Sequence, residues 1–578
     1  MALKKITPSK YQKKIYNFIK KGSGNAVINA KAGSGKTTTL IESMKLIPNT
    51  EKVLFVAFNK SIEQELSKKL EGIDNVKVKT YHGLGYSILL ENYHEQIEKI
   101  SEFKYATYIN NNIKKLSPSC LTLSKSDFSI YKNNIKQLVD FARFNLSQSS
   151  EEIKKLCQKY SINPILNETE IVPLVLKWGK NHINEIDYTD MIWLCIENDI
   201  ETRYFKFDFI FIDEAQDSSI MQQYLIKKCY KRGTRFVAIG DEFQCINAFA
   251  GADNEAFKKF QKEPNTIVLD LPITYRCPKN IISFVKDSNN IFMEPSPNAI
   301  DGEIRQDVSP FEPKNRDMVL CRNTAHLVKL YMKYISVNKK CFIKGRSIGE
   351  SLKTLALQTN KDKLSLDLTK DGVFPRLYEF LFKTIKKEMK NNSLSYEEVV
   401  NTNQIMDLID TIKAIEILSS GISNINELIN KINIIFTDDE NDGICLSTIH
   451  KAKGLEADNV YILCESLMPS KYAKKEWEKI SENNLKYVAV TRAKKTLNFI
   501  CEKQFSPNLF NNKSIIDELE IKRITINKIN NININSLINV DYKKNISNDV
   551  KQIMNINNYN NKSTNKQKIG ANKFSKFI

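Results

Sequence analysis

Apolar runs of strand length recur through the first half of the chain, and each ends in polar residues. They are NAVINA (25–30) before KAG, KVLFVA (52–57) before FNKS, FDFIFI (207–212) before DEAQD, RFVAIG (235–240) before DEFQ, and NTIVLDL (265–271) before PITYR. Continuous apolar runs of this length predict buried strands, and doubly wound α/β sheets bind ligands at the carboxyl ends of their strands. The pattern therefore predicts a parallel-sheet domain whose site lies at these strand ends.

A second set of short apolar runs predicts a second α/β domain. The runs lie in RDMVLCRN, CFIKG, GICLSTIH, NVYILC and TLNFICE. Stretches with helical periodicity interrupt both sets. We therefore expect an α/β fold with two parallel-sheet domains, each interrupted by a mostly helical insertion.

The predicted domain boundaries follow these patterns. The first sheet domain takes residues 1–85 and 185–275 around a helical insertion at 86–184, and the second takes 276–345 and 441–510 around an insertion at 346–440. Residues 525–578 are rich in Asn and Lys, as in NINNYNNKSTNKQK, with few apolar anchors for a core. Such composition predicts a flexible tail, to which a replication or repair protein could bind.

Composition narrows the class of partner. The chain has 86 Lys and Arg against 67 Asp and Glu, a net charge of +19, which favours nucleic acid over anionic membrane. Its 11 cysteines form no CxxC pair, which disfavours a zinc or iron–sulfur site and favours a reducing compartment. The sequence shows no apolar signal core and no membrane-length apolar run. We expect a soluble monomer or weak dimer, cytoplasmic in a bacterial or viral host, or nuclear in a eukaryote.

The stretch AKAGSGKTTT, residues 30–39, nearly matches the phosphate loop GxxxxGK[ST], with Ala30 in place of the first glycine. It follows a predicted strand and opens a predicted helix, so backbone N–H groups would face a bound phosphate. Lys36 would reach the β- and γ-phosphates of ATP, and Thr37 would ligate Mg²⁺. The residues expected to bind the nucleotide here are Ala30, Lys31, Ala32, Gly33, Ser34, Gly35, Lys36, Thr37 and Thr38.

An acidic pair follows the strand FDFIFI. Asp213 would hold Mg²⁺, and Glu214 would act as the general base on the attacking water. A guanine-nucleotide switch is disfavoured, because FNKSI has Ile62 where the NKxD motif requires aspartate.

By these features and the order of its motifs, the chain resembles the UvrD/Rep/PcrA-like superfamily 1A DNA helicases over about residues 5–505. The ordered motifs are TPSKYQKKIYNFI, VLFVAFNKSIEQEL, TYHGLGYSIL, IDEAQD, IGDEFQCINAFAGAD, TYRCPKNI, STIHKAKGLEADNVYIL and ENNLKYVAVTRAKKTL. The resemblance implies a P-loop NTPase with two RecA-like domains. It also implies nucleotide roles for Gln12 and Tyr275 at adenine, Gln244 and Arg276 at the γ-phosphate, Glu456 toward the nucleotide and Arg492 as the arginine finger.

The same resemblance implies a set of DNA contacts. Aromatic residues of the motifs would stack on bases beside a basic groove. The implied contacts are Phe58, Asn59, Lys60, His82, Phe249, Thr448 and His450. The chain departs from the family pattern at Asn247 and Ala250, where tyrosine and arginine are usual, and at Ser481, where an acidic residue is usual.

The leading functional prediction is an ATP- and Mg²⁺-dependent helicase that moves 3′ to 5′ on single-stranded DNA and unwinds duplex DNA in repair, recombination or replication. The polarity comes from the resemblance alone. One alternative is a superfamily 1B helicase of opposite polarity, which the UvrD-type STIHKAKGLE disfavours. Others are a translocase that strips proteins from DNA with little unwinding, and a nucleotide-gated scaffold.

Overall fold

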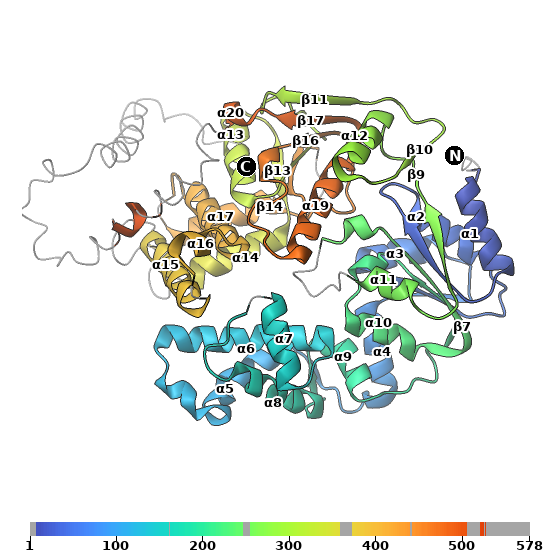
Figure 1. The fold of residues 1–578 in the computed structure, drawn as a ribbon, viewed down its shortest axis with the longest axis horizontal. Helices are drawn as coiled ribbons and strands as arrows, with labels where there is room; N and C mark the ends of the chain where they lie inside the picture. Colours follow the sequence, from blue (N-terminus) through green and yellow to red (C-terminus); the bar gives the residue numbers. More distant parts are fainter. Residues whose placement is uncertain are drawn as a thin grey trace, which may run out of the picture. The chain divides into compact units, whose positions relative to one another are not determined.

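The computed structural model describes residues 7–505, except 161, 247–254, 359–372, 393, 423 and 440–441, and also 519, 521–524 and 526. The chain divides into two units, residues 1–516 and 517–578, and the described residues of the second are helical. The predicted tail at 525–578 lies outside the described residues apart from Ile526. The fold and the site described below belong to the first unit (Figure 1).

The first sheet has six parallel strands in the order β3-β2-β6-β7-β1-β8. Side chains alternate between its two faces. Ala26 and Ile28 pack with one set of helices, whereas Val27 packs with the other, so both faces are covered. We call this sheet and the helices on it the first lobe. Its strands are β1 (Asn25–Ala30), β2 (Val53–Ala57), β3 (Val76–Thr80), β6 (Phe207–Ile212), β7 (Tyr230–Gly240) and β8 (Thr266–Leu271).

The helices of the first lobe divide between these faces. Apolar residues of α1 (Lys10–Lys21), α2 (Lys36–Met44) and α3 (Lys60–Lys69) belong to one core cluster. Those of α4 (Tyr81–Tyr93), α9 (Asp190–Glu197), α10 (Ile220–Lys228) and α11 (Ala256–Gln261) belong to the other. Because the six strands are parallel, their carboxyl ends lie along the same edge of the sheet.

Two strands of the first sheet differ from the sequence prediction. NTIVLDL was predicted as a buried strand, but β8 lies at the sheet edge, where Ile267 and Val268 are 40% and 50% exposed. The prediction was wrong because an apolar run does not distinguish an edge strand from a central one. The other edge strand, β3, was missed because VKVKT alternates and has no continuous apolar run.

The first insertion is helical and is held by buried charges. Lys104 Nζ donates to Asp190 at 2.6 Å, and Arg143 donates to Asp190 at 2.9 Å and to Asp187 at 2.8 Å. The predicted domain boundary at residue 85 falls inside α4. The domain boundaries stay a prediction. The elements of the first insertion are β4 (Lys99–Ile100), α5 (Lys104–Leu116), α6 (Lys125–Asn145), α7 (Ser150–Tyr160), α8 (Glu168–Asn181) and β5 (Glu185–Ile186).

The second sheet has seven strands in the order β11-β17-β16-β12-β15-β13-β14, and all its pairings are parallel. We call this sheet and the helices α12, α13 and α19 the second lobe. Its elements are α12 (Lys279–Asn289), β11 (Glu303–Val308), β12 (Met318–Cys321), α13 (Thr324–Ser336), β13 (Cys341–Lys344), β14 (Phe436–Thr437), β15 (Ile444–Thr448), β16 (Ala457–Ile462), α19 (Glu476–Val490), β17 (Ala493–Ile500) and α20 (Glu502–Phe505). A two-stranded pair joins β9 (Ile273–Thr274), which follows β8, to β10 (Glu294–Pro295), which follows α12.

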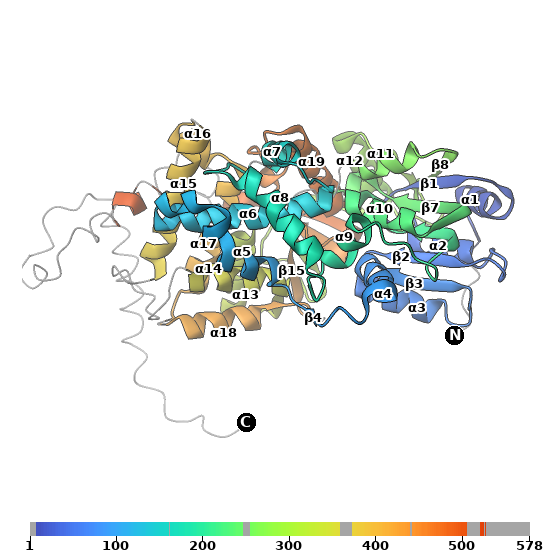
Figure 2. The same ribbon diagram turned by 90° about the horizontal axis from the view of Figure 1, so that it is seen from below.

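The second insertion consists of helices in its described residues. They are α14 (Arg346–Gln358), α15 (Val373–Asn392), α16 (Tyr396–Val400), α17 (Asn403–Leu418) and α18 (Ile425–Ile435), which pack on one another in yellow and light orange in Figures 1 and 2. The predicted fold class, two parallel-sheet domains with helical insertions, is confirmed. In the part of the chain that the structure describes, no helix combines the length and apolar character needed to cross a bilayer.

Candidate nucleotide and DNA site

The phosphate loop joins the end of β1 to the start of α2. Gly33 and Gly35 have φ of 70° and 77°, a left-handed conformation that glycine adopts at little cost. Ser34 is 1% exposed, and its Oγ has no hydrogen-bond partner among the described residues. Unpaired N–H groups at a helix start and an unpaired buried hydroxyl are suited to phosphate oxygens. The loop is therefore suited to the phosphates of a nucleoside triphosphate.

Ala30 and Lys31 open the loop, and Ala30 stands where the phosphate-loop motif has its first glycine. Ala30 is fully buried in the core of the first lobe, so a small apolar side chain is accommodated there. Lys31 is also buried, and its ammonium lies 4.3 Å from the centre of the Phe243 ring and donates to Asn29 at 3.2 Å. Thr38, by contrast, is exposed on α2.

The lysine of the loop and the acidic pair meet at the end of β6. Lys36 Nζ donates to Glu214 Oε1 at 2.6 Å, and Glu214 has φ of 48°, a strained conformation for a non-glycine residue. Burial opposes ionisation of Glu214, but the ammonium groups of Lys36 and Lys453 outweigh it and lower its pKa to about 2. Glu214 is therefore an anion near neutral pH.

Asp213 lies deeper than its neighbour. It is 3% exposed, and burial together with the charge of Glu214 raises its pKa to about 6. Its Oδ1 accepts from the Glu214 N–H at 2.9 Å. Thr37 lies in the first turn of α2 and is half-buried. A buried carboxylate and a helix-start hydroxyl are oxygen donors of the kind that Mg²⁺ prefers.

Two glutamines were assigned nucleotide roles, and each is fixed by hydrogen bonds. Gln12 closes a capping box at the start of α1 and donates from Nε2 to Thr39 Oγ1 at 3.0 Å, which places it beside α2. Gln244 follows β7, is buried, and donates from Nε2 to Asp241 Oδ2 at 2.8 Å.

Arg276 belongs to a segment packed directly against the phosphate loop. The Tyr275 N–H donates to the Gly33 carbonyl at 2.8 Å. A Cβ on Gly33 would lie 2.5 Å from the Arg276 Cβ, so only glycine permits this approach. Arg276 Nε donates to Glu456 Oε2 at 2.6 Å, and the Tyr275 ring is 48% exposed.

Arg492 is the most deeply buried cation of the candidate site. It is 1% exposed, and it donates to the carbonyls of Val488 at 2.9 Å and Leu455 at 3.2 Å. Burial and the nearby Arg276 guanidinium lower the pKa of Arg492 to about 10, so it remains charged at neutral pH. Its bonds in the described residues go to neutral acceptors, which leaves its charge available to a phosphate.

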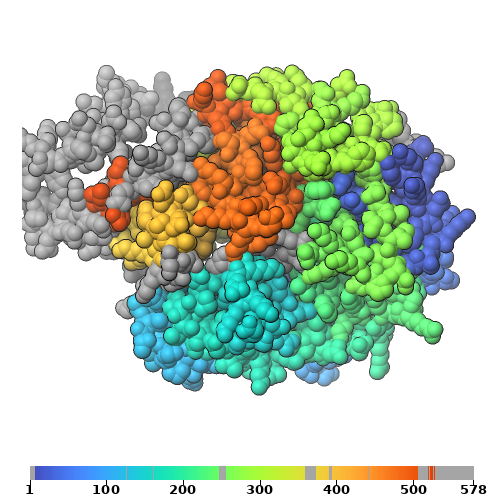
Figure 3. Space-filling view, in the orientation of Figure 1, coloured from blue at the N-terminus to red at the C-terminus, as the bar shows by residue number. Residues whose placement is uncertain are grey.

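Lys453 is a site residue that sequence reasoning missed. It lies in the quoted segment STIHKAKGLE of the second lobe, yet its Nζ bonds Asp217 Oδ2 and donates to the Gln244 carbonyl at 2.7 Å, both in the first lobe. Its position inside a helicase motif could have signalled a role, but its partners are more than 200 positions away. In Figure 3 the orange surface of the second lobe adjoins the green surface of the first.

The predicted DNA contacts differ in their exposure and in whether their side chains already have partners. Phe58, between β2 and α3, is 42% exposed. Asn59 instead caps α3, because its Oδ1 accepts from the Ile62 N–H at 2.9 Å, and Lys60 pairs with Glu63 at 3.0 Å. The prediction for Phe249 lies outside the described residues.

The remaining DNA candidates lie at element ends. His82 lies in the first turn of α4 and meets Tyr188 edge-on, with ring centres 6.5 Å apart. Thr448 ends β15 and is buried, and burial together with the charge of Arg322 lowers the pKa of His450 to about 4. His450 is therefore neutral near pH 7.

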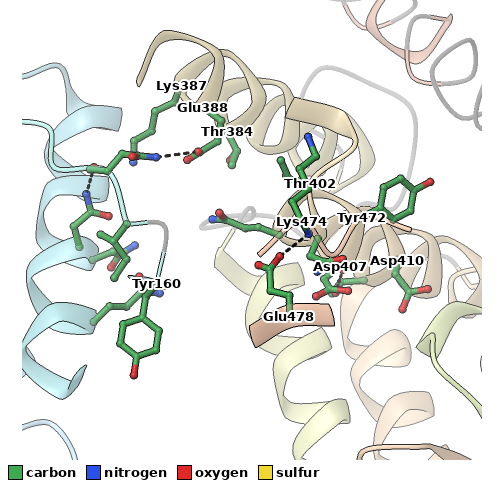
Figure 4. A pocket seen from close by; sticks show the side chains of 18 of the residues that line it. Tyr160, Thr384, Lys387, Glu388, Thr402, Asp407, Asp410, Tyr472, Lys474 and Glu478 are labelled. Carbon is green, nitrogen blue, oxygen red and sulfur yellow. Dashed lines mark hydrogen bonds between the residues drawn. The ribbon is translucent and has the colours of Figure 1, made fainter. Parts of the chain in front are cut away.

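Thr448 and His450 line a cavity of about 1480 Å³ shared by the second lobe and both insertions. Figure 4 shows Tyr160 of the first insertion across from Thr384, Lys387 and Glu388 of the second. Its aromatic lining residues are Phe141, Tyr160, Phe380, Tyr472 and Trp477, and its basic ones are Arg322, Arg376, Lys383, Lys387, Lys451, Lys474 and Lys475.

Family comparisons agree with this arrangement. The model of the UvrD/REP helicase N-terminal domain matches residues 11–265, and that of the UvrD-like helicase C-terminal domain matches residues 443–500. The first match carries the phosphate loop and the acidic pair, and the second carries Lys453 and Arg492. Between them, the two matches cover both sides of the candidate site.

Individual helicases are similar to this chain over most of its length. The ATP-dependent DNA helicase Rep of Buchnera aphidicola is 23% identical over 84% of this chain and 93% of its own length, and PcrA of Bacillus subtilis is 22% identical over 83% and 81%. The F-box DNA helicase protein 1 of Schizosaccharomyces pombe is 26% identical over 81% of this chain, which spans 55% of that relative.

The chain therefore belongs to the UvrD/Rep/PcrA-like helicases. The class of enzyme expected from the motifs, an ATP-dependent DNA helicase, is confirmed with it. The assignment of individual residues stays a prediction.

Proposed function

We propose that this chain is an ATP-driven motor that moves 3′ to 5′ along single-stranded DNA and separates duplex DNA during repair, recombination or replication. The observation that carries the proposal is the split of the triphosphate site between the lobes. Lys36, Asp213 and Glu214 belong to the first lobe, whereas Lys453 and Arg492 come from the second. Hydrolysis at such a site depends on how the lobes meet, which couples chemistry to motion.

Several charged residues of the site have proposed roles. Lys36 and the loop N–H groups bind phosphate oxygens, and Arg276 and Arg492 stabilise the charge that develops on the transferred phosphoryl group. Glu214, already ionised, orients the attacking water and accepts its proton. Thr37 and Asp213 would hold Mg²⁺, which when bound neutralises charge on the phosphates.

The cavity next to Thr448 and His450 supports a path for the strand. Bases stack on aromatic rings and phosphates pair with lysine and arginine, and both kinds of side chain line this cavity. It also contains carboxylates: Arg322 already pairs with Glu482 at 2.8 Å. We therefore assign phosphate contacts to its lysines rather than to Arg322.

The decisive assay uses duplexes with a 3′ tail, a 5′ tail or no tail. We expect ATP-dependent unwinding of the 3′-tailed duplex and stimulation of ATP hydrolysis by single-stranded DNA. Preference for the 5′ tail would overturn the polarity. ATP hydrolysis that single-stranded DNA does not stimulate would overturn the motor function. DNA-stimulated hydrolysis without unwinding would favour a translocase that strips proteins from DNA.

A further inference from the structure

A single tyrosine hydroxyl joins three segments of the candidate site. Tyr487 lies on α19 of the second lobe and is fully buried. Its hydroxyl accepts from the Ala32 N–H of the phosphate loop at 3.0 Å and donates to Asp241 Oδ2 at 2.9 Å. A phenol has one proton to donate, so these bonds fix its orientation.

The acceptor of that proton also holds Gln244. Gln244 Nε2 donates to the same Asp241 oxygen at 2.8 Å. An amide nitrogen carries two hydrogens, so Gln244 keeps one that could reach a phosphate. The orientation of Gln244 therefore depends on Asp241, which Tyr487 holds from the other lobe.

The backbone of Tyr487 leads to the buried arginine. Its carbonyl accepts from Thr491 Oγ1 at 2.8 Å, and the same Oγ1 accepts from Arg492 at 3.1 Å. One residue thus contacts the phosphate loop, the partner of Gln244 and the residue that positions Arg492. Separation of the lobes would break the first two of these contacts together.

The neighbours of the ring help to hold the hydroxyl, whose oxygen also lies 4.0 Å from Met293 Sδ. Phe243 meets the Tyr487 ring edge-on, with centres 6.1 Å apart, and helps to fix it. Burial and the charge of Asp241 hold the pKa of Tyr487 well above its ordinary value, so the hydroxyl keeps its proton near neutral pH. The phenol is a hydrogen-bonding group in this site rather than an acid or base.

We propose that Tyr487 is a positioning residue that transmits lobe closure to Gln244 and the phosphate loop, and so links DNA binding to the rate of ATP hydrolysis. The proposal rests on the proposed motor function. It assigns Tyr487 no contact with the nucleotide or with DNA.

The test is Tyr487→Phe, which keeps the ring and removes both hydrogen bonds. We expect the ratio of DNA-stimulated to basal ATP turnover to fall by about fivefold or more, as for loss of a buried hydrogen bond. The change should appear in kcat, whereas KM for ATP should stay within about threefold of wild type. Asp241→Asn, which weakens the acceptor of the Tyr487 hydroxyl, should also lower this ratio.

Tyr334→Phe is the matched control. Tyr334 is fully buried too, and its hydroxyl donates to the Pro310 carbonyl at 2.7 Å within the second lobe. Tyr334→Phe should lower the thermal stability by a similar amount but keep the ratio of DNA-stimulated to basal ATP turnover within about twofold of wild type. A Tyr487→Phe ratio within the same range would overturn the proposal, whereas a wild-type enzyme that DNA does not stimulate would instead overturn the motor function.

Discussion

The two lobes share one sheet architecture but contribute opposite charge to the nucleotide site. The first lobe provides Asp213, Glu214 and Asp217 near the Lys36 ammonium. The second provides Lys453 and Arg492, and Arg492 bonds only neutral acceptors among the described residues. Neither lobe alone places equal numbers of acidic and basic groups there, and we propose that the triphosphate binds where the two lobes meet.

The largest effect is expected in the first lobe. Lys36→Ala removes the ammonium that balances Glu214 and would bind phosphate, so ATP turnover should fall about a thousandfold or more. Steady-state phosphate release measures it. Lys45→Ala, at the other end of α2 and paired with Glu42, should retain turnover. Biological activity preserved in the Lys36→Ala chain would favour a scaffold.

The corresponding change in the second lobe should separate chemistry from binding. Arg492→Ala should lower kcat by about a hundredfold to a thousandfold, because an arginine finger acts mainly on the transition state. Equilibrium titration should still detect ATP binding. Lys495→Ala, an exposed neighbour paired with Asp458 at 2.9 Å, is the control. Loss of ATP binding in Arg492→Ala would contradict the finger role.

Gly33→Ala tests the contact between the phosphate loop and Arg276. The added Cβ would overlap Arg276, so kcat should fall by about tenfold to a hundredfold through misplacement of the arginine. Gly72→Ala has the same kind of positive φ, 86°, but open space around it. Both variants should lose stability, and only Gly33→Ala should lose turnover. Equal losses of turnover would show that backbone strain alone is responsible.

Phe58→Ala tests the strand contact of the first lobe. Loss of one stacked base should weaken single-stranded DNA binding by about 1–3 kcal/mol, as measured by fluorescence anisotropy. Phe311, which is 41% exposed against 42% for Phe58, gives a matched control in Phe311→Ala. Equal affinity of the two variants for DNA would remove Phe58 from the interface.

The smallest effect concerns acid stability of the second lobe. Burial lowers the pKa of His326 from 6.5 to about 4, so its stabilising effect is complete above about pH 6.5 and is lost as the pH falls toward 4. His326→Gln should reduce the loss of unfolding free energy between pH 7 and 5 by about 1–2 kcal/mol. His94→Gln, at an exposed histidine, should leave that loss unchanged.

The sequence predicts the site better than it predicts the contacts between lobes. The phosphate loop and the acidic pair could be predicted because each follows a continuous apolar strand, and the structure brings Lys36 and Glu214 together. Tyr487 and Lys453 were missed because their partners lie 455 and 236 positions away, at Ala32 and Asp217. Exposed Asn59 was predicted as a DNA contact, yet local geometry commits its side chain to capping α3.

The most direct test of a site shared by two lobes is ATP turnover by wild-type and Arg492→Ala chains, with and without single-stranded DNA, at saturating ATP. We predict that DNA raises wild-type turnover by about tenfold or more and that Arg492→Ala abolishes this gain while ATP still binds. Undiminished DNA-stimulated turnover in Arg492→Ala would contradict the account, because hydrolysis would then proceed without the second lobe.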